Sequence, residues 1–216
     1  MQIFPAKTPE FVKSLFPQFL WQVPSEKKVL YLTFDDGPTP KITEWVLDQL
    51  KHYQAKATFF CIGNNIEKYP DIFSKTVDGG HTIGNHTFHH LKGWKTKSKN
   101  YLKDIEQTQK IIERSTSTDL FRPPYGKFKI TQARQLLSLG YEVVLWDVLS
   151  YDWDQNISPK TCFNNVVSKT TKGSIIVMHD SQKASKNLMY ALPRVLEYFS
   201  DRDYVFEALD TRRIPE

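Results

Sequence analysis

The sequence predicts an α/β fold in which a parallel β-sheet closes into a barrel. The first observation is a regular alternation, because short runs rich in β-branched and aromatic residues are separated by segments with apolar residues at helical spacing. The second is size, since 216 residues with 40% hydrophobic content are ample for one large core, and α/β barrels of this length are usually single domains. Strands that alternate with helices pair in parallel. The chain shows no internal repeat, low-complexity tract or linker.

Each expected strand is a short, mostly apolar run. The first, residues 29–34, has no charged side chain, as in a strand buried on both faces, and ends abruptly in Asp35-Asp36-Gly37-Pro38. In chain order, the expected strands span residues 29–34, 57–62, 81–84, 120–121, 141–146, 174–178 and 204–206.

The expected helices lie between these strands. Apolar residues recur at helical spacing from Ile42 to Leu50, after the start signal Thr39-Pro40, and Gly140 is a typical residue just past a helix end. In chain order, the expected helices span residues 42–50, 64–78, 101–114, 130–139, 159–169 and 188–199.

Residues 1–28 are expected to form an N-terminal extension that packs on the barrel domain, residues 29–216. Prolines interrupt the extension, and it has no continuous apolar stretch typical of a signal peptide. A full-length chain is therefore expected in the cytoplasm, whereas a chain whose leader has been removed would act in the cell envelope or outside the cell. The residues suited to one short amphipathic turn against the barrel are Phe11, Leu15, Phe16 and Phe19.

Composition argues against several function classes. The net charge is +5 and the pI about 9.0, but the lysine clusters at residues 92–103 and 169–172 lack an ordered array of base-stacking aromatics, so no nucleic-acid partner is expected. Cys61 and Cys162 form no CxxC pair, which gives no sign of a thiol metal site or redox motif. Cys61 lies in an apolar run and is expected to be a buried small hydrophobe. No segment is long enough to span a bilayer.

Polar side chains gather where the expected strands end. The carboxyl ends of the strands of a parallel barrel lie on one face, and active sites form there from the loops that follow. Five polar clusters at such ends therefore indicate one convergent site. In strand order, the clusters are Asp35-Asp36, His86 to His90, Arg122, Asp152 and His179.

His86 and His90 are the candidate metal ligands. Four residues apart, they would lie on one side of a helical turn and reach one ion, whereas His89 points elsewhere. Two imidazoles and a carboxylate from another strand end leave coordination positions open for water and substrate, as in catalytic metal sites. Taken alone, a His-x-x-x-His pair is more often structural, and Asp-Asp-Gly is common in plain turns.

Three more positions allow alternative interpretations. His179 ends an apolar strand and is either a core histidine bonded to a main-chain carbonyl or a general acid opposite the metal. Asp152 either orients His179 or pairs with Arg122, and the indole of Trp153 forms a wall. Arg122 itself is a cation on a loop that Pro123-Pro124 makes rigid.

These residues fall in five ordered motifs. The motifs are Thr33-Phe34-Asp35-Asp36-Gly37, His86-Thr87-Phe88-His89-His90, Arg122-Pro123-Pro124-Tyr125-Gly126, Ser150-Tyr151-Asp152-Trp153 and Ile176-Val177-Met178-His179. Their order and content resemble those of the NodB-type polysaccharide deacetylases, carbohydrate esterase family 4. The resemblance spans about residues 29–207. It implies the fold of that family, a distorted (β/α)7 barrel that is a variant of the TIM barrel.

The resemblance also implies roles for the acid–base and metal-binding residues. Asp35 would be the general base, oriented by Arg122. His179 would be the general acid, tuned by Asp152. One divalent metal ion is implied, usually zinc, with cobalt, nickel and ferrous iron also compatible. Its implied ligands are Asp36, His86 and His90.

Other implied roles concern the substrate. The main-chain N–H of Tyr125 would help to hold the oxyanion, and Trp153 and Val177 would line the acetyl pocket. Two positions depart from the family pattern: Leu91 follows His90 where proline is usual, and Val177 stands where leucine is usual. No implied metal ligand or acid–base residue is lost, which argues against an inactive relative.

Together these features predict a metal-dependent deacetylase. It would remove the N-acetyl group from GlcNAc- or MurNAc-containing glycans of the chitin-oligosaccharide or peptidoglycan type, and release acetate and a free amino sugar. The expected partner is such an N-acetylated oligo- or polysaccharide, bound by a monomer. One alternative is an O-acetyl esterase of the acetylxylan type, or a small-amide hydrolase, on the same metal site. The other is a catalytically silent glycan-binding barrel.

Overall fold

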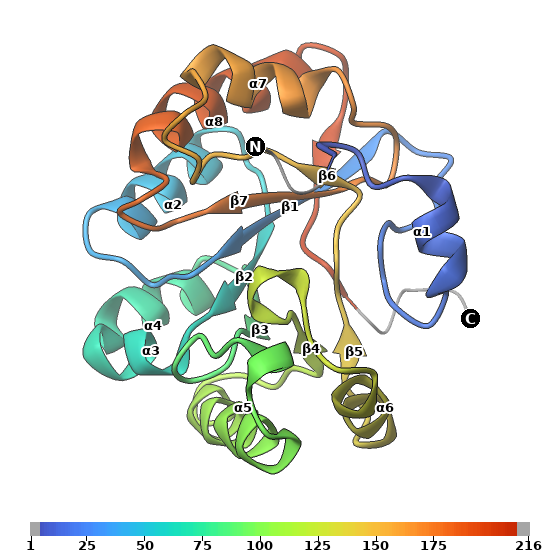
Figure 1. Ribbon diagram of the computed structural model, residues 1–216. Coiled ribbons are helices and arrows are strands. Elements are labelled where there is room, and N and C mark those ends of the chain that lie inside the picture. Colours follow the sequence, from blue (N-terminus) through green and yellow to red (C-terminus); the bar gives the residue numbers. More distant parts are fainter. Residues whose placement is uncertain (1–4, 211–216) are drawn as a thin grey trace.

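The computed structural model describes residues 5–210, which form a curled parallel β-sheet surrounded by helices (Figure 1). The strand order is β5-β4-β3-β2-β1-β7-β6, and β8 pairs with β1. The prediction of an α/β fold built on a parallel sheet is confirmed. The strands are β1 (Val29–Asp35), β2 (Ala57–Cys61), β3 (Thr82–Asn85), β4 (Leu120–Phe121), β5 (Glu142–Val143), β6 (Val148–Leu149), β7 (Ile175–His179) and β8 (Val205–Phe206).

Helices cover the outside of the curled sheet (Figure 1). No helix within residues 5–210 is both long and apolar enough to cross a membrane. The helices are α1 (Glu10–Leu15), α2 (Ile42–His52), α3 (Gly63–Lys68), α4 (Pro70–Asp78), α5 (Ser98–Ile112), α6 (Ile130–Ser138), α7 (Pro159–Val167) and α8 (Ser185–Ser200), with 3₁₀ turns η1 (Gly93–Lys95) and η2 (Pro124–Gly126).

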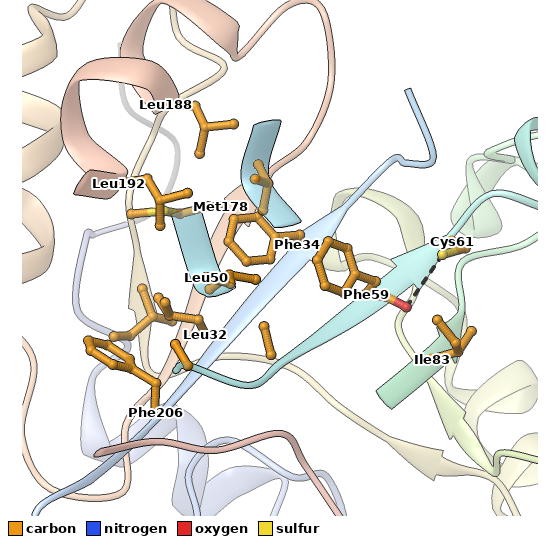
Figure 2. Close-up of a cluster of buried hydrophobic side chains, with 14 of the residues drawn as sticks. Leu32, Phe34, Leu50, Phe59, Cys61, Ile83, Met178, Leu188, Leu192 and Phe206 are labelled. Atoms are coloured by element: carbon orange, nitrogen blue, oxygen red, sulfur yellow. Dashed lines mark hydrogen bonds between the residues drawn. The ribbon is translucent and has the colours of Figure 1, made fainter. Parts of the chain in front are cut away.

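The strand β1 lies inside the sheet, between β2 and β7, and also pairs with β8. Its Leu32 and Phe34 are fully buried, and the ring of Phe34 stacks on Phe59 of β2 with 5.1 Å between centroids. Figure 2 shows this pair packed among side chains of the flanking helices and of β7, including Leu50 and Met178. This packing holds the carboxyl end of β1, and with it Asp35, on a rigid part of the molecule.

The strand predicted at residues 141–146 is wrong in extent. Only Glu142–Val143 pairs with β4, and the chain rejoins the sheet at β6, beside β7. Between them, the main chain of Leu20 accepts a hydrogen bond from Leu145 and donates one to Val143. An apolar run can pair with any neighbouring segment, and here the N-terminal segment takes the place of a sheet strand.

The helix predicted at residues 64–78 is two helices, α3 and α4. Tyr69, which joins them, has a non-helical backbone (φ −132°, ψ 57°). Pro70 explains the break, because its ring disfavours helical geometry at the preceding residue while suiting the first turn of a new helix.

Both Cys61 and Cys162 are buried, which confirms the prediction for Cys61.

The N-terminal segment connects the two edge strands of the sheet, β5 and β6. Isolated bridges join Lys7 to Val148 of β6 and Leu20 to Val144, just beyond β5. Of the four residues expected to pack in one amphipathic turn, Phe19 is buried but lies beyond α1, whereas Phe11, Leu15 and Phe16 are 67%, 66% and 38% exposed. The orientation expected for the helical turn is therefore wrong, because α1 buries Lys13 instead.

The burial of Lys13 has an electrostatic cause. Its ammonium lies 2.6 Å from one carboxylate oxygen of the fully buried Asp147, and the ammonium of Lys7 lies 2.7 Å from the other. A buried carboxylate is costly unless it is paired, so Asp147 orients α1 with its lysine inward. Apolar spacing alone contains no information on this partner.

Candidate active site

Asp36, His86 and His90 form a compact group at the carboxyl ends of β1 and β3. One ligand atom from each lies within 4.8 Å of the other two. The carboxylate Oδ1 of Asp36 is 3.2 Å from Nε2 of His90 and 3.8 Å from Nε2 of His86. Two imidazole nitrogens and one carboxylate oxygen that converge in this way fit a divalent transition metal with positions left for water and substrate.

The loop that carries the two histidines is not the helical turn that their spacing predicts. Thr87 and His90 have positive φ angles of 65° and 53°, and Asp36 has a φ of 82°. Such left-handed conformations of non-glycine residues cost about 1–2 kcal/mol each and are typical of functional sites. The convergence of these side chains therefore depends on backbone conformations that residue spacing does not reveal.

His86 is fixed by a hydrogen bond on the side away from Asp36. Its Nδ1 donates to the main-chain carbonyl of Arg122 across 2.7 Å, which leaves Nε2 with its lone pair directed toward Asp36. Burial lowers the pKa of His86 to about 4, so the ring is neutral at physiological pH. A neutral imidazole is the form that binds a metal.

Asp36 is a permanently ionised ligand candidate. Burial acts to raise the pKa of this carboxyl, but the hydrogen bond from His90 and the nearby imidazoles outweigh burial and hold the pKa well below its usual range. The main-chain carbonyl of Asp36 also accepts a 2.8 Å hydrogen bond from Nδ2 of Asn65. The carboxylate is therefore available to a cation at all ordinary pH values.

Asp35 points to a different partner than its neighbour does. Nη1 of the fully buried Arg122 lies 2.7 Å from Oδ1 of Asp35 and 2.7 Å from Oγ1 of Thr33. The remaining guanidinium nitrogens donate to the main-chain carbonyls of Val144 and Leu145. This network fixes the position of the Asp35 carboxylate, in line with the distinct roles expected for the two adjacent aspartates.

His179 at the end of β7 is held by Asp152. Its Nδ1 lies 2.8 Å from Oδ1 of Asp152, and its main-chain N–H donates to Oδ2 across 2.6 Å. Burial alone would lower the pKa of His179, but the Asp152 carboxylate and, to a lesser degree, Asp36 and Asp35 raise it to about 9. Of the two interpretations of Asp152, the structure favours the one in which it orients His179, while Arg122 pairs with Asp35.

These groups line one cleft of about 560 Å³. Trp153 and Val177 are also part of its wall, and the indole of Trp153 lies edge-on to His179 with 4.7 Å between ring centroids. The acid–base and metal-ligand candidates in the lining are Asp35, Asp36, His86, His90 and His179. Residues that follow distant strands in the sequence, and were expected to converge, therefore lie on one face of the fold.

Tyr125 stands at the rim of this cleft in η2. Its backbone is left-handed (φ 61°, ψ 10°) and its ring centroid is 4.7 Å from that of His90. The next residue must be glycine, because a Cβ on Gly126 would lie 2.3 Å from the indole of Trp146. The loop is thus packed against the cleft wall, with the Tyr125 ring beside the metal-ligand candidate His90.

Three structural features of the site were not assigned from the sequence. Asp104 accepts from Nδ1 of His89 at 2.6 Å and from the main-chain N–H of Phe88, and so it anchors the histidine loop and engages His89. Asp180 accepts from the N–H of Gly37 at 3.0 Å, and burial raises the pKa of Asp180 to about 7. The third is a group of cleft-lining side chains, Lys92, Trp94, Lys127, Trp146, Tyr151, Asp154 and Lys183. Of these features, only Asp180 could be noticed in the sequence, as an acidic residue directly after His179.

Comparison with known proteins gives consistent matches. The family model described as polysaccharide deacetylase matches residues 22–144. A peptidoglycan-N-acetylglucosamine deacetylase from Bacillus cereus is 34% identical over 189 residues, which cover 86% of this chain and 88% of that protein. The peptidoglycan-N-acetylmuramic acid deacetylase PdaC from Bacillus subtilis is 35% identical over 185 residues, 84% of this chain but only 38% of PdaC.

A solved structure agrees with these sequence matches. The crystal structure of the Bc1960 peptidoglycan N-acetylglucosamine deacetylase in complex with 4-naphthalen-1-yl-N-oxidanyl-benzamide superposes with a TM-score of 0.86 at 32% identity. The superposition covers 94% of this chain and 95% of that one. The expected distorted (β/α)7 barrel is therefore confirmed.

Proposed function

Because this chain belongs to the polysaccharide deacetylase family, we propose that it hydrolyses the N-acetyl group of GlcNAc- or MurNAc-containing glycans of the peptidoglycan type. The chain would thus be a hydrolase that acts on N-acetyl amide bonds of polysaccharides. The products here would be acetate and a free amino sugar. The relatives named as peptidoglycan deacetylases support this choice of polymer. Such a substrate favours a place in the cell envelope, where we expect the protein to act as a monomer.

One observation carries the proposal. A carboxylate held by a buried arginine and a histidine held by a buried aspartate line the same cleft as the two-histidine, one-carboxylate group. Their strand ends are adjacent, because Asp35 of β1 is in register with His179 of β7. A proton acceptor, a proton donor and a cation site within one cleft are the groups that amide hydrolysis requires.

Asp36, His86 and His90 would hold one divalent cation, for which we propose zinc, with cobalt, nickel and ferrous iron as alternatives. When bound, the cation would supply Lewis-acid polarisation of the acetamide carbonyl and favour deprotonation of the attacking water. The neutral state of His86 and the ionised state of Asp36 suit this donor set.

Asp35 would take the proton from the water that attacks the acetamide carbon. Arg122 keeps this carboxylate in place through a buried ion pair of 2.7 Å. The main-chain N–H of Tyr125 would donate to the developing oxyanion, a contribution of about 3–4 kcal/mol for one such donor. Trp153 and Val177 would enclose the acetyl methyl group and exclude water from it.

His179 would complete the reaction as the C–N bond breaks. Its Nδ1 is occupied by Asp152, so the proton for the departing amine nitrogen would come from Nε2. The raised pKa of His179, about 9, keeps the ring protonated at neutral pH. A protonated donor is needed because an amine anion is a very poor leaving group.

Acetate release tests the proposal directly. Purified protein would be incubated with chitin oligosaccharides, peptidoglycan fragments and acetylxylan, each with zinc, cobalt, nickel or ferrous iron. We expect acetate together with a new free amine from the N-acetylated glycans, and no turnover by Asp35→Asn although this variant still binds metal. Release from acetylxylan alone would identify an O-acetyl esterase. Glycan binding without acetate release under any metal would instead indicate a silent glycan-binding barrel.

A further inference from the structure

We propose that Lys92, Lys127 and Lys183 make the cleft selective for glycans that carry carboxylate groups close to the N-acetyl group. This inference rests on the proposed function and specifies its substrate class. All three lysines line the cleft that holds the acid–base and metal-ligand candidates, and their side chains are exposed. None of them is used by the reaction described above.

The ammonium group of Lys92 lies close to the reacting centre. Its Nζ is 5.6 Å from the ring centroid of Tyr125, and that ring is 4.7 Å from the ring of His90. A single aromatic ring thus separates the ammonium from a metal-ligand candidate. Cation–π attraction of this kind stabilises the ammonium in a defined position at the rim.

Lys127 and Lys183 extend the positive charge around the mouth. Nζ of Lys127 lies 6.0 Å from the ring centroid of Trp94, and Trp94 packs edge-on against Tyr125 with 5.5 Å between centroids. Lys183 belongs to a different segment, the loop between β7 and α8. A ligand in the cleft therefore meets ammonium groups from three separate loops.

The cleft lining also contains three carboxylates, those of Asp35, Asp36 and Asp154. Asp35 is paired with Arg122, and Asp36 faces the imidazoles of His86 and His90. Oδ1 of Asp154 accepts two 2.9 Å hydrogen bonds from Asn156. Within residues 5–210, neither Lys92 nor Lys183 forms an ion pair with a carboxylate. An anionic ligand group at the mouth would complement this potential, which favours both capture and orientation.

The segment that follows Lys92 carries further lysines. No acidic residue occurs between Lys92 and Lys103, and this segment runs from the cleft rim through η1 into the first turns of α5. Its further lysines, all with exposed side chains, are Lys95, Lys97, Lys99 and Lys103. A long anionic chain that entered the cleft could follow this path, whereas an uncharged one would gain nothing from it.

The chemistry of the candidate glycans separates them by charge. Chitin oligosaccharides and acetylxylan are uncharged, but each muramic acid residue of peptidoglycan has an acidic substituent on the carbon next to the one that bears the acetamide. Where this substituent bears no stem peptide, its carboxylate lies about one sugar ring or less from the scissile bond. Where a peptide is attached, that carboxyl is an amide and the free carboxylates lie on the peptide. The lysine rim therefore favours peptidoglycan-type strands over the uncharged polymers.

The test compares kcat/KM for acetate release from three substrates of equal length: a chitin oligosaccharide, a carboxylated peptidoglycan glycan fragment, and the same fragment with its carboxylates amidated. For the wild-type protein we expect the carboxylated fragment to be preferred over its amidated form by about tenfold or more, as three exposed charge pairs would give. This preference should shrink as salt rises to about 1 M, where charge interactions are screened within about 3 Å.

The variant Lys92→Gln/Lys127→Gln/Lys183→Gln should lose the preference, and the corresponding triple arginine variant should retain it. A charge-matched control is Lys51→Gln/Lys68→Gln/Lys160→Gln, which removes three exposed lysines that do not line the cleft and should keep the preference. Equilibrium binding of the same fragments to Asp35→Asn gives a second reading that does not depend on turnover.

The outcomes separate the two proposals. Equal kcat/KM for the carboxylated and amidated fragments, or equal loss of preference in the control variant, overturns the lysine assignment while the deacetylase assignment stands. Absence of acetate release from every substrate with every metal overturns the deacetylase assignment and the selectivity that rests on it.

Discussion

The main-chain carbonyl of Arg122 accepts a 2.7 Å hydrogen bond from Nδ1 of His86. The guanidinium of the same arginine binds the Asp35 carboxylate. One buried residue thus orients a metal-ligand candidate through its backbone and the candidate base through its side chain. Because the two contacts use different parts of Arg122, a substitution can separate them.

Arg122→Lys is expected to lower kcat by about 10–100-fold with little change in metal affinity. A lysine keeps the charge but cannot bind Thr33, Asp35 and two carbonyls at once, so the carboxylate loses its fixed position. The carbonyl that orients His86 remains. Steady-state acetate release and metal titration would measure the two effects. Arg194→Lys, an exposed arginine that stacks on Tyr190, is the matched control, and a parallel loss of metal would contradict this division of roles.

His86→Ala and His90→Ala are expected to lose metal, whereas His89→Ala keeps it. Loss of a hydrogen-bond partner behind a ligand already weakens binding by about 10–100-fold, so loss of a ligand should cost at least about 100-fold. His89 lies in the same five-residue motif but binds Asp104, which makes it an internal control. Metal content after dialysis and zinc titration would check this. Equal metal loss in all three variants would mean that metal binding depends on the conformation of the loop rather than on the two imidazoles.

The sequence was sufficient to predict which residues meet, because strand ends of a parallel barrel share one face. Asp35, Arg122 and His179 could be grouped from strand order alone, before any distance was known. The conformations that aim the side chains could not be predicted, since left-handed Thr87 and His90 are imposed by contacts such as the hydrogen bond from the Thr87 N–H to Asn85.

The residues that line the mouth of the cleft could not be predicted from the sequence either. Lys92 and Lys183 are far apart in the chain and carry no periodic signal, so only the fold shows that they line one cleft. Pro70, by contrast, was visible and marks the end of α3, yet apolar spacing through Ile66 and Phe73 suggested one continuous helix. There the local rule for proline outweighs the periodic pattern.

The pH dependence of kcat/KM should show an alkaline limb near pH 9, set by His179. Its folded-state pKa is raised from 6.5 to about 9, so the protonated ring persists at neutral pH and is lost as pH rises through about 9. By the same linkage, the His179–Asp152 pair stabilises the fold fully below about pH 6.5, and this contribution is lost by about pH 9. Asp152→Asn removes the main charge that raises the pKa and should move the limb to lower pH.

Initial rates between pH 6 and 10 on one N-acetylated oligosaccharide would define the limb. His52→Asn, which changes a histidine at the end of α2 outside the cleft, should leave the profile unchanged. An unshifted limb in Asp152→Asn would assign the alkaline titration to another group.

Asp147→Ala is expected to reduce the free energy of unfolding by about 3–5 kcal/mol. The substitution removes the buried carboxylate beside the Lys13 ammonium, which then keeps only Glu10, whose side chain is 73% exposed, and the side-chain oxygen of Gln22. Removal of one partner from a buried ion pair is strongly destabilising. Lys7→Gln removes the more exposed of the two lysines, whose side chain is 30% accessible, and should cost about 1 kcal/mol or less. Urea unfolding monitored by tryptophan fluorescence would give both values.

The same substitution should also reduce turnover, although Asp147 is not part of the cleft lining. The main-chain N–H of Thr8 donates to the Asp147 carbonyl, and the main chain of Leu20 is hydrogen-bonded to Val143 and Leu145. The N-terminal segment therefore holds Val144 and Leu145, whose carbonyls accept hydrogen bonds from the Arg122 guanidinium. Loosening this segment should displace Arg122 and then Asp35, with metal affinity retained. The double variant Lys13→Met/Asp147→Leu, which removes both charges and fills the space with apolar atoms, should recover most of the stability. Wild-type turnover in Asp147→Ala, together with recovered stability in the double variant, would contradict this prediction. The N-terminal segment would then serve only to close the barrel and would not support the position of Asp35.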